Sequence, residues 1–457
     1  MSKRAGEPVG AGRQGARSRA PIQEIRAGLI GFGTIGTGVV KLLQKRRAAI
    51  EAMLGARLRL VRIADLDTKR DRGVRLPKGM LVADAKQVYE GDDIDVVIEL
   101  MGGYEPARRF VLAAIAQGKS IVTANKALLA VHGREVFGAA ARERVDIGFE
   151  ASVGGGIPIV RVLRDGVVAD RTVAVRGIVN GTCNYILSKM SAEGAQFGDV
   201  LAEAQARGLA EADPSFDIDG IDSAHKLVIL SALAFGTEIH LKDVHVEGIR
   251  HVAQMDVGYA HELGYEIKLL AIGSMHGDDV AVRVHPTLVP ATHVLAGVRG
   301  AFNAIYVEGE ALGSSMYYGL GAGMMPTATA VVADLIEIAR NRLQDTSARV
   351  PPLGIPVLRR PRRVPMGDLR TAYYLRIMVR DRPGVLGNIA SILGRHGISI
   401  ATVIQKERSA GGTVPVVIRT HEARERDLQA ALGRIRRLAG VQGPPVCLRI
   451  ADDLGGS

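Results

Sequence analysis

The sequence has few of the residues that hold small secreted or metal-bound proteins together. Its 457 residues include no tryptophan, 4% aromatic residues and two cysteines, Cys183 and Cys447. Two cysteines so far apart in the sequence provide neither a disulfide framework nor a zinc finger, and they suit a reducing compartment. With so few aromatic side chains, aliphatic residues must build the cores.

Long apolar runs are also missing. A helix that crosses a bilayer needs roughly 18 apolar residues. The longest candidate, residues 227–235, is much shorter and directly follows Lys226. The N-terminus is basic but has no apolar stretch of the kind found in secretory signals. These absences predict a cytoplasmic protein with no membrane partner.

The net charge of +11 is concentrated in two segments. Residues 1–26 carry a net +4 and residues 359–382 a net +6, which leaves the rest of the chain nearly neutral. No helix-turn-helix, zinc-finger or RNP pattern accompanies these charges. We therefore interpret residues 1–24 as a disordered, solvated arm and the second segment as part of a basic linker. Nucleic acid is not an expected partner.

The order of strands and helices predicts an α/β protein. In residues 25–150, strands at 25–30, 58–64, 94–100 and 120–123 alternate with helices at 34–53 and 107–117, which is typical of a Rossmann-type, doubly wound parallel sheet. Residues 151–343 mix strands at 172–178, 280–288 and 304–310 with helices at 184–191, 197–207, 220–235 and 251–263. This mixture indicates an α+β domain for substrate binding and dimerisation. Its last helix, expected at residues 327–342, could return to the nucleotide domain.

A segment rich in proline and arginine separates these domains from a C-terminal module. Five prolines fall in residues 344–369. Because proline disrupts both helices and sheet ladders, we interpret residues 344–372 as a linker between parts that fold separately. Residues 373–452 then follow the order strand, helix, strand, strand, helix, strand, at 374–380, 387–396, 399–405, 414–420, 422–437 and 446–450. That order predicts a ferredoxin-like module.

The strand at 25–30 leads into a glycine-rich turn and a helix. The turn reads Gly31-Phe32-Gly33-Thr34-Ile35-Gly36. Gly31 would form the tight turn, Gly33 would let the backbone approach a pyrophosphate, and Gly36 would let helix and strand pack closely. The start of the helix, with Thr34 and Ile35, then offers its N–H groups to the phosphates. The motif therefore predicts NAD or NADP binding, and a glycine-rich turn without a ligand is the alternative.

The end of the second strand leaves the choice between these two cofactors open. Asp65 could accept hydrogen bonds from the ribose hydroxyls of NAD. Lys69 and Arg70, close by in the sequence, could instead pair with the extra phosphate of NADP, or they could be solvated loop charges. The sequence does not decide between these interpretations.

Five later stretches are specific in combination and in order. They are residues 123–126 (TANK), 150–158 (EASVGGGIP), 180–185 (NGTCNY), 208–214 (GLAEADP) and 217–226 (DIDGIDSAHK). Over residues 25–342 the chain resembles homoserine dehydrogenase, and residues 381–387 (DRPGVLG) resemble the ligand loop of an ACT domain. The resemblance implies an NAD(P)-dependent oxidoreductase that interconverts L-homoserine and L-aspartate 4-semialdehyde in threonine, methionine and isoleucine biosynthesis. Because no aspartokinase region precedes the nucleotide domain, we expect a monofunctional enzyme.

The residue types agree with that chemistry. Hydride transfer between an alcohol and an aldehyde requires a group that moves the hydroxyl proton. Asp222 and Lys226 are four residues apart and share a helix face. Burial would lower the pKa of the lysine while the adjacent carboxylate would raise it, so Lys226 could stay protonated yet able to donate. A surface ion pair is the alternative interpretation of the same spacing.

The resemblance also assigns roles to individual residues. It implies that Glu211 and Asp222 contact homoserine, that Lys226 is the catalytic proton donor, and that Lys126 lies beside substrate and nicotinamide. It further implies cofactor contacts at Gly208 and Gly323. A monovalent cation, sodium, is implied on a carbonyl-rich turn with ligands at Glu150, Val153, Gly155 and Ile157, and a purely structural turn is the alternative.

Other readings of these residues are weaker. We reject a calcium-binding EF-hand loop around Gly220, because Lys226 would stand where that loop needs a bidentate glutamate. The histidines show neither HExxH spacing nor a nucleophile elbow, and we interpret them as packing or surface residues.

The C-terminal module predicts regulation by a small ligand. Residues 381–387 place a Pro-Gly turn before a helix, whose first N–H groups suit a ligand carboxylate. The resemblance implies an amino-acid effector, threonine as the pathway end product, and a homodimer or higher homo-oligomer. A purely dimerising module is the alternative. Two other functions stay open, namely another ACT-bearing dehydrogenase that would use a His–Glu pair, and a non-enzymatic amino-acid or redox-responsive regulator.

Overall fold

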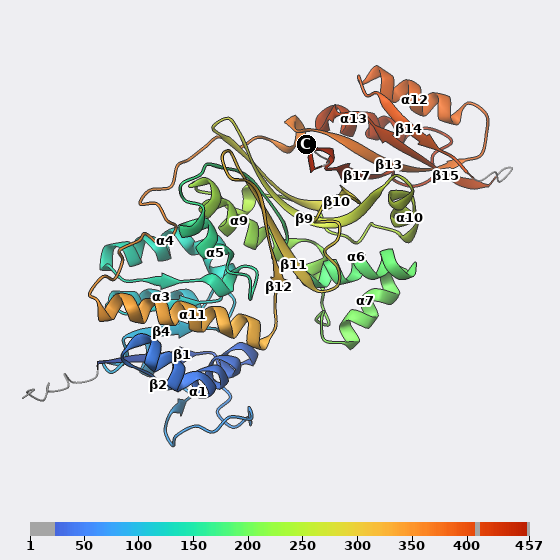
Figure 1. The fold of residues 1–457 in the computed structure, drawn as a ribbon. Helices are drawn as coiled ribbons and strands as arrows, with labels where there is room; N and C mark the ends of the chain where they lie inside the picture. The colour runs from blue at the N-terminus through green and yellow to red at the C-terminus, as the bar shows by residue number, and fades with distance from the viewer. Residues whose placement is uncertain (1–22, 407–411, 455–457) are drawn as a thin grey trace, which may run out of the picture.

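The structure, a computed structural model, describes residues 23–406 and 412–454. The arm predicted at residues 1–24 lies almost entirely outside the described residues. Figure 1 shows an elongated molecule with a nucleotide-type sheet at one end, a central sheet, and the C-terminal module at the other end.

The N-terminal sheet is parallel throughout. Its strands are β1 (Glu24–Ile30), β2 (Arg57–Ala64), β3 (Leu81–Val82), β4 (Val96–Glu99), β5 (Ser120–Thr123) and β6 (Ile147–Gly148). They lie in the order β3-β2-β1-β4-β5-β6, so the chain reverses direction across the sheet between β1 and β4. This confirms the doubly wound fold predicted from the sequence, and a ligand crevice is expected outside the carboxyl ends of β1 and β4.

Helices cover both faces of this sheet, and one of them comes from far along the chain. The local helices are α1 (Thr34–Leu54), α2 (Lys86–Tyr89), α3 (Ala107–Ala116) and α4 (Lys126–Glu143). The distant one is α11 (Met324–Leu343), which packs against α1 (Figure 1). The contact is close at Gly38, where an added Cβ would lie 2.8 Å from Met324. The last helix of the middle region therefore returns to the nucleotide sheet.

The central sheet is antiparallel and confirms the predicted α+β domain. Its strands are β7 (Thr172–Ile178), β9 (Tyr265–His276), β10 (Asp279–Pro290), β11 (Phe302–Gly309) and β12 (Gly313–Leu320), in the order β12-β11-β7-β9-β10. Helices near it are α6 (Gly181–Glu193), α7 (Phe197–Ala206), α9 (Ile221–Phe235) and α10 (Gln254–Glu262). Gly273 on β9 leaves room for Phe235 and Ser231 of α9, which fixes this helix against the sheet.

The C-terminal module has the predicted ferredoxin-like order. It contains β13 (Arg370–Arg380), α12 (Val385–Arg395), β14 (Ile400–Ile404), β15 (Thr413–Thr420), α13 (Glu425–Ile435) and β17 (Val446–Ile450), with sheet order β17-β13-β15-β14. Strand β17 also pairs in parallel with β10, through Thr287 with Arg449 and Leu288 with Ile450. The two sheets are therefore one sheet of 11 strands, which also includes the short strands β8 (His245–Val246), parallel to β10, and β16 (Ala423–Arg424), which pairs with β13. That the module folds as a separate unit stays a prediction, although the pairing of β17 with β10 joins it to the central sheet.

Buried charges reinforce the junction between module and central sheet. Arg449 of β17 donates to Glu247 at 2.7 Å and to Glu425 at 2.8 Å. Asp256 of α10 is fully buried and accepts from Tyr374 at 2.9 Å and from Arg376 at 2.6 Å. Burying these ion pairs is tolerable because each of these carboxylates and guanidinium groups takes part in at least two hydrogen bonds.

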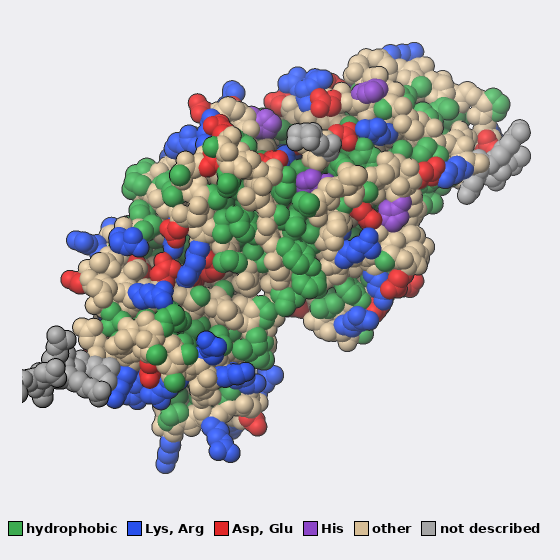
Figure 2. All heavy atoms as spheres, viewed as in Figure 1, with side chains coloured by type: hydrophobic (Ala, Val, Ile, Leu, Met, Phe, Trp, Pro, Cys, Tyr) green, Lys and Arg blue, Asp and Glu red, His purple; other side chains and the backbone are tan. Residues whose placement is uncertain are grey.

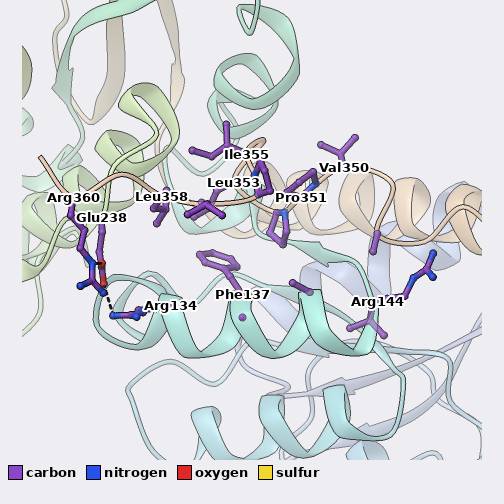
Figure 3. A pocket seen from close by; sticks show the side chains of 17 residues that line it. Arg134, Phe137, Arg144, Glu238, Val350, Pro351, Leu353, Ile355, Leu358 and Arg360 are labelled. Carbon is purple, nitrogen blue, oxygen red and sulfur yellow. Dashed lines mark hydrogen bonds and ion pairs between the residues drawn. The ribbon is translucent and has the colours of Figure 1, made fainter. Parts of the chain in front are cut away.

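The proline-rich segment is a packed strap and does not act as a free spacer. Arg359 pairs with Thr237 and Arg363 with Val280 in single β-bridges. Figure 3 shows the strap crossing α4, with Leu353 and Pro351 facing Phe137 across a cavity of about 590 Å³. As expected from its prolines, the segment forms neither a helix nor a long sheet ladder. The apolar side chains of the segment nevertheless pack against the rest of the protein.

Candidate active site

The glycine-rich turn lies at the crevice between β1 and β4. Gly31 has φ +96°, and a Cβ there would lie 2.7 Å from the carbonyl oxygen of Leu100. A Cβ at Gly36 would clash with the carbonyl oxygen of Gly31. At Gly33, by contrast, a Cβ would meet no described atom within 4 Å. Gly31 and Gly36 are thus required by the fold itself, whereas the space at Gly33 is open to a ligand.

The start of α1 suits a phosphate group. Gly33 is the N-cap residue of α1 and supplies no side-chain cap, and Thr34 and Ile35 form the first turn. The first N–H groups of a helix lack partners within the helix and carry partial positive charge. The residues present therefore fit the pyrophosphate of a dinucleotide.

Asp65 is already engaged by a residue that the sequence prediction missed. Its carboxylate accepts from the backbone N–H of Phe32 at 2.6 Å and from Arg72 at 3.1 Å. The Arg72 guanidinium also lies over the Phe32 ring, 4.7 Å from its centroid. Lys69 and Arg70, the cations considered from the sequence, are exposed. The cation closest to the expected ribose position is thus Arg72.

Two lysines from different domains meet on one carboxylate. Lys226 donates to Oδ2 of Asp222 at 2.7 Å and to the carbonyl oxygen of Val179 at 2.6 Å. Lys126, at the start of α4, pairs with Oδ1 of Asp222 at 2.9 Å. The Asp222 side chain is 4% exposed and the Lys226 side chain 11%. The predicted Asp222–Lys226 pair is therefore formed, and it is buried.

The electrostatics of this centre shift the pKa values of the two lysines in opposite directions. Burial lowers the pKa of Lys226; Asp222 opposes this effect and the positive charge of Lys126 adds to it. Burial alone would also lower the pKa of Lys126, but Asp222, Asp217 and Glu211 outweigh it and raise that pKa. Lys226 is therefore the lysine that more readily gives up its proton.

Asn180 organises the acidic side of the centre. Its Nδ2 donates to Asp217 and to Asp222, each at 2.8 Å, while its Oδ1 accepts from the N–H of Cys183 at the start of α6. Asn180 belongs to a stretch singled out in the sequence but was not assigned a role. An amide that must donate to two carboxylates and cap a helix can be identified only once the three elements are placed together.

The remaining substrate and cofactor residues assigned from the sequence are Glu211, Gly208 and Gly323. Glu211 is exposed in the loop after α7, and among the described residues its carboxylate has no hydrogen-bond or ion-pair partner. Gly208, at the end of α7, has φ +69°, and Gly323, the N-cap of α11, has φ +115°. Both backbone conformations favour glycine.

Aromatic residues wall the centre on one side. The Tyr104 hydroxyl lies 3.2 Å from Nε2 of His225, and Phe216 stacks on the same imidazole at 5.4 Å. Lys126 lies 5.8 Å from the centroid of Phe216. The sequence analysis gave Tyr104 and Phe216 no role and interpreted the histidines as packing or surface residues, because isolated aromatic side chains give no periodic signal.

The turn proposed for sodium is buried beside a second acidic cluster. Both Glu150 carboxylate oxygens accept from backbone N–H groups, from Val160 at 2.8 Å and from Arg161 at 3.0 Å. Burial and nearby Asp334 raise the pKa of Glu150 to about 7. Both oxygens of the Glu150 side chain are thus already used as acceptors for backbone N–H groups. A cation there would fit only through backbone oxygens at Glu150, Val153, Gly155 and Ile157.

The chain is similar along nearly all of its length to homoserine dehydrogenases. Residues 31–150 match the family profile of the homoserine dehydrogenase NAD binding domain, residues 158–336 that of homoserine dehydrogenase, and residues 373–440 that of the ACT domain. A homoserine dehydrogenase from Neisseria gonorrhoeae is 43% identical over 94% of this chain and 99% of its own. The chain belongs to the homoserine dehydrogenase family.

Solved homoserine dehydrogenases have the same fold. One from Thiobacillus denitrificans is 45% identical, covers 94% of this chain and 98% of its own, and superposes with a TM-score of 0.89. One from S. aureus is 30% identical over 94% of this chain and 99% of its own, with a TM-score of 0.73. The protein is thus an NAD(P)-dependent oxidoreductase of the homoserine dehydrogenase type with a C-terminal ACT domain. Among the described residues, no helix combines the length and apolarity that a membrane span requires.

Proposed function

We propose that Lys226 is the acid–base residue of homoserine dehydrogenase activity in this chain. The observation that carries the proposal is the buried contact of Lys226 with Asp222 and with the Val179 carbonyl. Both acceptors hold the amine in one orientation, while burial and Lys126 lower its pKa. An acid–base group works best when its pKa lies near the working pH.

The two directions of the reaction use the same amine. The residues at the glycine-rich turn would hold NAD(P)+, whose bound nicotinamide would supply the acceptor for the hydride on the carbon that bears the hydroxyl of L-homoserine. The neutral amine of Lys226 takes the hydroxyl proton, and in the reverse direction the ammonium returns that proton to the aldehyde oxygen of L-aspartate 4-semialdehyde. Asp222 stabilises the ammonium and Lys126 the neutral amine. The substrate ammonium is assigned to Glu211 and Asp222, because carboxylates are its natural acceptors.

A pair of variants tests this role. Lys226→Met should lower kcat by at least about 10², the usual scale of a general acid–base contribution. Binding of NADPH, followed by its fluorescence, should stay within twofold of wild type. Lys189→Met is the matched control, because Lys189 pairs with Glu203 on the far side of α6. Wild-type turnover in Lys226→Met would make Lys226 a purely structural residue.

Arg72 bears on which cofactor is used. We propose that NAD and NADP both fit, with Gly31, Gly33, Thr34, Ile35, Gly36, Gly208 and Gly323 along the cofactor and Lys126 beside the nicotinamide. Arg72 would pair with the 2′-phosphate of NADP, and Asp65 would accept from the ribose of NAD. A hyperthermophilic archaeal homoserine dehydrogenase, 25% identical over 69% of this chain and 98% of its own with a TM-score of 0.60, was solved with NADPH. Arg72→Ala should raise KM for NADP+ at least tenfold more than KM for NAD+, in homoserine oxidation measured with each cofactor.

A monovalent cation, sodium, is proposed on the turn at residues 150–157. The support is the excess of buried carboxylates there, since Glu150 and Asp334 share one guanidinium, that of Arg161. Replacing choline chloride by sodium chloride at constant ionic strength should raise the melting temperature at pH 8. An identical melting temperature in both salts would leave the turn structural.

Threonine is the proposed effector of the ACT domain. The loop at residues 381–387 borders a cavity of about 400 Å³, and Gly384, with φ +88°, is the N-cap of α12. Free helix N–H groups there suit the carboxylate of an amino acid. Titrating L-threonine into the full-length enzyme should inhibit homoserine oxidation 5-fold or more, the lower end of typical allosteric coupling. Absence of inhibition would leave the module a dimerisation element.

A homodimer is proposed through the outer strands of the central sheet. Figure 2 shows hydrophobic side chains gathered over β11 and β12. Phe302, Met316, Tyr318 and Leu320 are 37–52% exposed there. Exposed apolar groups on an edge strand favour association. Tyr318→Asp should shift the sedimentation coefficient of the enzyme toward that of a monomer.

A further inference from the structure

A second cavity lies where the central sheet meets the ACT domain. It measures about 340 Å³. Its floor is the face of β7, β9 and β10 that points away from α9, and its wall is formed by the start of β13, the start of α13 and the residues that follow β17. None of its lining residues belongs to the loop at residues 381–387 or to the active site.

An arginine in the floor of this cavity has no counter-ion. Arg283 on β10 and Arg176 on β7 flank Ile272 of β9 in the sheet register. Arg176 pairs with Glu308 and with Asp453. Arg283 has no carboxylate within ion-pair distance among residues 23–406 and 412–454, and within those residues its guanidinium donates one hydrogen bond, a long one of 3.4 Å to the Ser274 hydroxyl. Burial, together with Arg176 and Arg449, lowers the pKa of Arg283 to about 10.

A histidine two residues further along the same strand is also incompletely bonded. His285 is 1% exposed, and its Nδ1 lies 2.9 Å from the Thr287 hydroxyl. Its Nε2 is buried without a hydrogen-bond partner among the described residues, and the side chain lines the cavity. A buried polar atom without a protein partner needs a water, an ion or a ligand to satisfy it.

We propose that this junction cavity binds the carboxylate of a small organic acid, with Arg283 as its counter-ion and with Ser274 and His285 as hydrogen-bond partners. A guanidinium is the side chain best suited to a carboxylate, which it can hold through two parallel hydrogen bonds. The volume lies within the usual range of small-molecule sites. The ligand would touch both the central sheet and the ACT domain.

The charges at the rim leave two sources for the carboxylate. Glu422, Asp452 and Asp453 line the outer part of the cavity and could accept the ammonium of a free amino acid. A simple dicarboxylic acid would use Arg283 and the exposed Arg370 instead. Both ligands share the carboxylate on Arg283, so the probes are chosen to separate them.

The test is titration calorimetry on the full-length enzyme with L-threonine and with sodium succinate. Ionic strength is held constant with sodium chloride, because screening alone would otherwise alter the heats. Arg283→Met should weaken binding of the probe at least tenfold, since a charge-assisted hydrogen bond contributes at least that factor. Arg362→Met is the matched control, because Arg362 is 84% exposed on the strap and lies outside the cavity. It should bind both probes as wild type does.

The stability of the variant gives an independent reading. Without ligand, Arg283→Met should melt at or above the wild-type temperature, because the substitution removes a half-buried cation that has no carboxylate partner among the described residues. Homoserine oxidation should be unchanged. Succinate binding that depends on Arg283 assigns the site to plain organic acids, and threonine binding that depends on Arg283 assigns it to amino acids.

Three results would overturn the proposal. The first is that the binding heats of both probes are the same in Arg283→Met as in wild type. The second is that this variant fails to fold. The third is that the variant enzyme dissociates into smaller species in sedimentation, which would mean that a second copy of the chain supplies the counter-ion of Arg283. Threonine that binds only at residues 381–387 would give heats insensitive to Arg283. Failure of the cavity is thus distinguishable from failure of the effector loop or of catalysis.

Discussion

Removing the charge of Lys126 should move the pH dependence of catalysis without changing the reaction. The two lysine amines bind different oxygens of Asp222, at 2.9 and 2.7 Å. Because both amines contact the same carboxylate, their nitrogen atoms are at most about 8 Å apart. At that separation and an effective dielectric constant of about 20, two positive charges repel by roughly 2 kcal/mol, which corresponds to a pKa change of roughly 1.5 units. Because the Lys126 side chain is 34% exposed, screening by water reduces the expected shift to about one unit.

The sign follows from the direction of the reaction. Oxidation of homoserine needs the neutral amine of Lys226, so kcat/KM rises as pH rises through the pKa of this residue. Lys126 lowers that pKa, and Lys126→Met should therefore raise it and move the rising limb to higher pH by about one unit. Lys126→Arg keeps the charge and should leave the limb in place.

The assay is initial-rate homoserine oxidation from pH 6 to pH 11 with wild type and both variants. The free-enzyme profile is the relevant one, because kcat/KM reports groups of the enzyme before substrate binds. Ionisation of the substrate ammonium is the same in all three proteins and cancels from the comparison. If the limb lies at the same pH in Lys126→Met and Lys126→Arg, the two lysines are not coupled through Asp222 and the electrostatic reasoning is wrong.

Three other predictions concern cofactor, junction and module. Gly33→Ala should keep the wild-type melting temperature yet bind NADPH at least tenfold more weakly, because only a ligand occupies the space at Gly33; equal affinity would place the pyrophosphate elsewhere. Asp256→Asn should lower the free energy of unfolding by about 3 kcal/mol in denaturant titrations, because it leaves Arg376 buried without its charge partner, while kcat stays unchanged; a change below the measurement error would contradict this. A chain ending after Leu343 should keep every assigned catalytic residue and lose inhibition by threonine, but it should melt earlier and self-associate in light scattering, because the β10 edge loses its pairing with β17. A truncated chain that is monodisperse and equally stable would show that the shared sheet contributes little.

Features that depend on local sequence were predicted correctly. The turn from Gly31 to Gly36 is specified by backbone geometry within six residues, and Asp222 and Lys226 meet because helices bring residues four apart together. The strand and helix pattern likewise predicted the doubly wound parallel sheet and the chain order of elements in the ACT domain. The resemblance named Lys126, which contacts Asp222; its place beside substrate and nicotinamide stays a prediction.

Features that depend on distant pairing were not predicted. Arg72 reaches Asp65 through an irregular loop that has no periodic signal, and Tyr104 meets His225 across the gap between two domains. Strands β9 and β12 were not recognised, although the strands beside them were. The pairing of β17 with β10 joins residues more than 150 positions apart, and no pattern in either strand indicates which edge it will choose.

The pairing of β17 with β10 can form only after the ribosome has made the C-terminal strand. Strand β10 ends at Pro290, and β17 begins only at Val446. At about 5–20 residues per second, a ribosome needs roughly 8–30 s to make the intervening chain. Through that interval the free edge of β10, together with Glu247 beside it, has neither β17 nor Arg449 to cover it. Slow translation of the last third of the message, or a stop codon within it, would leave this edge uncovered for longer, so the yield of folded enzyme in a cell depends on how quickly its C-terminus arrives.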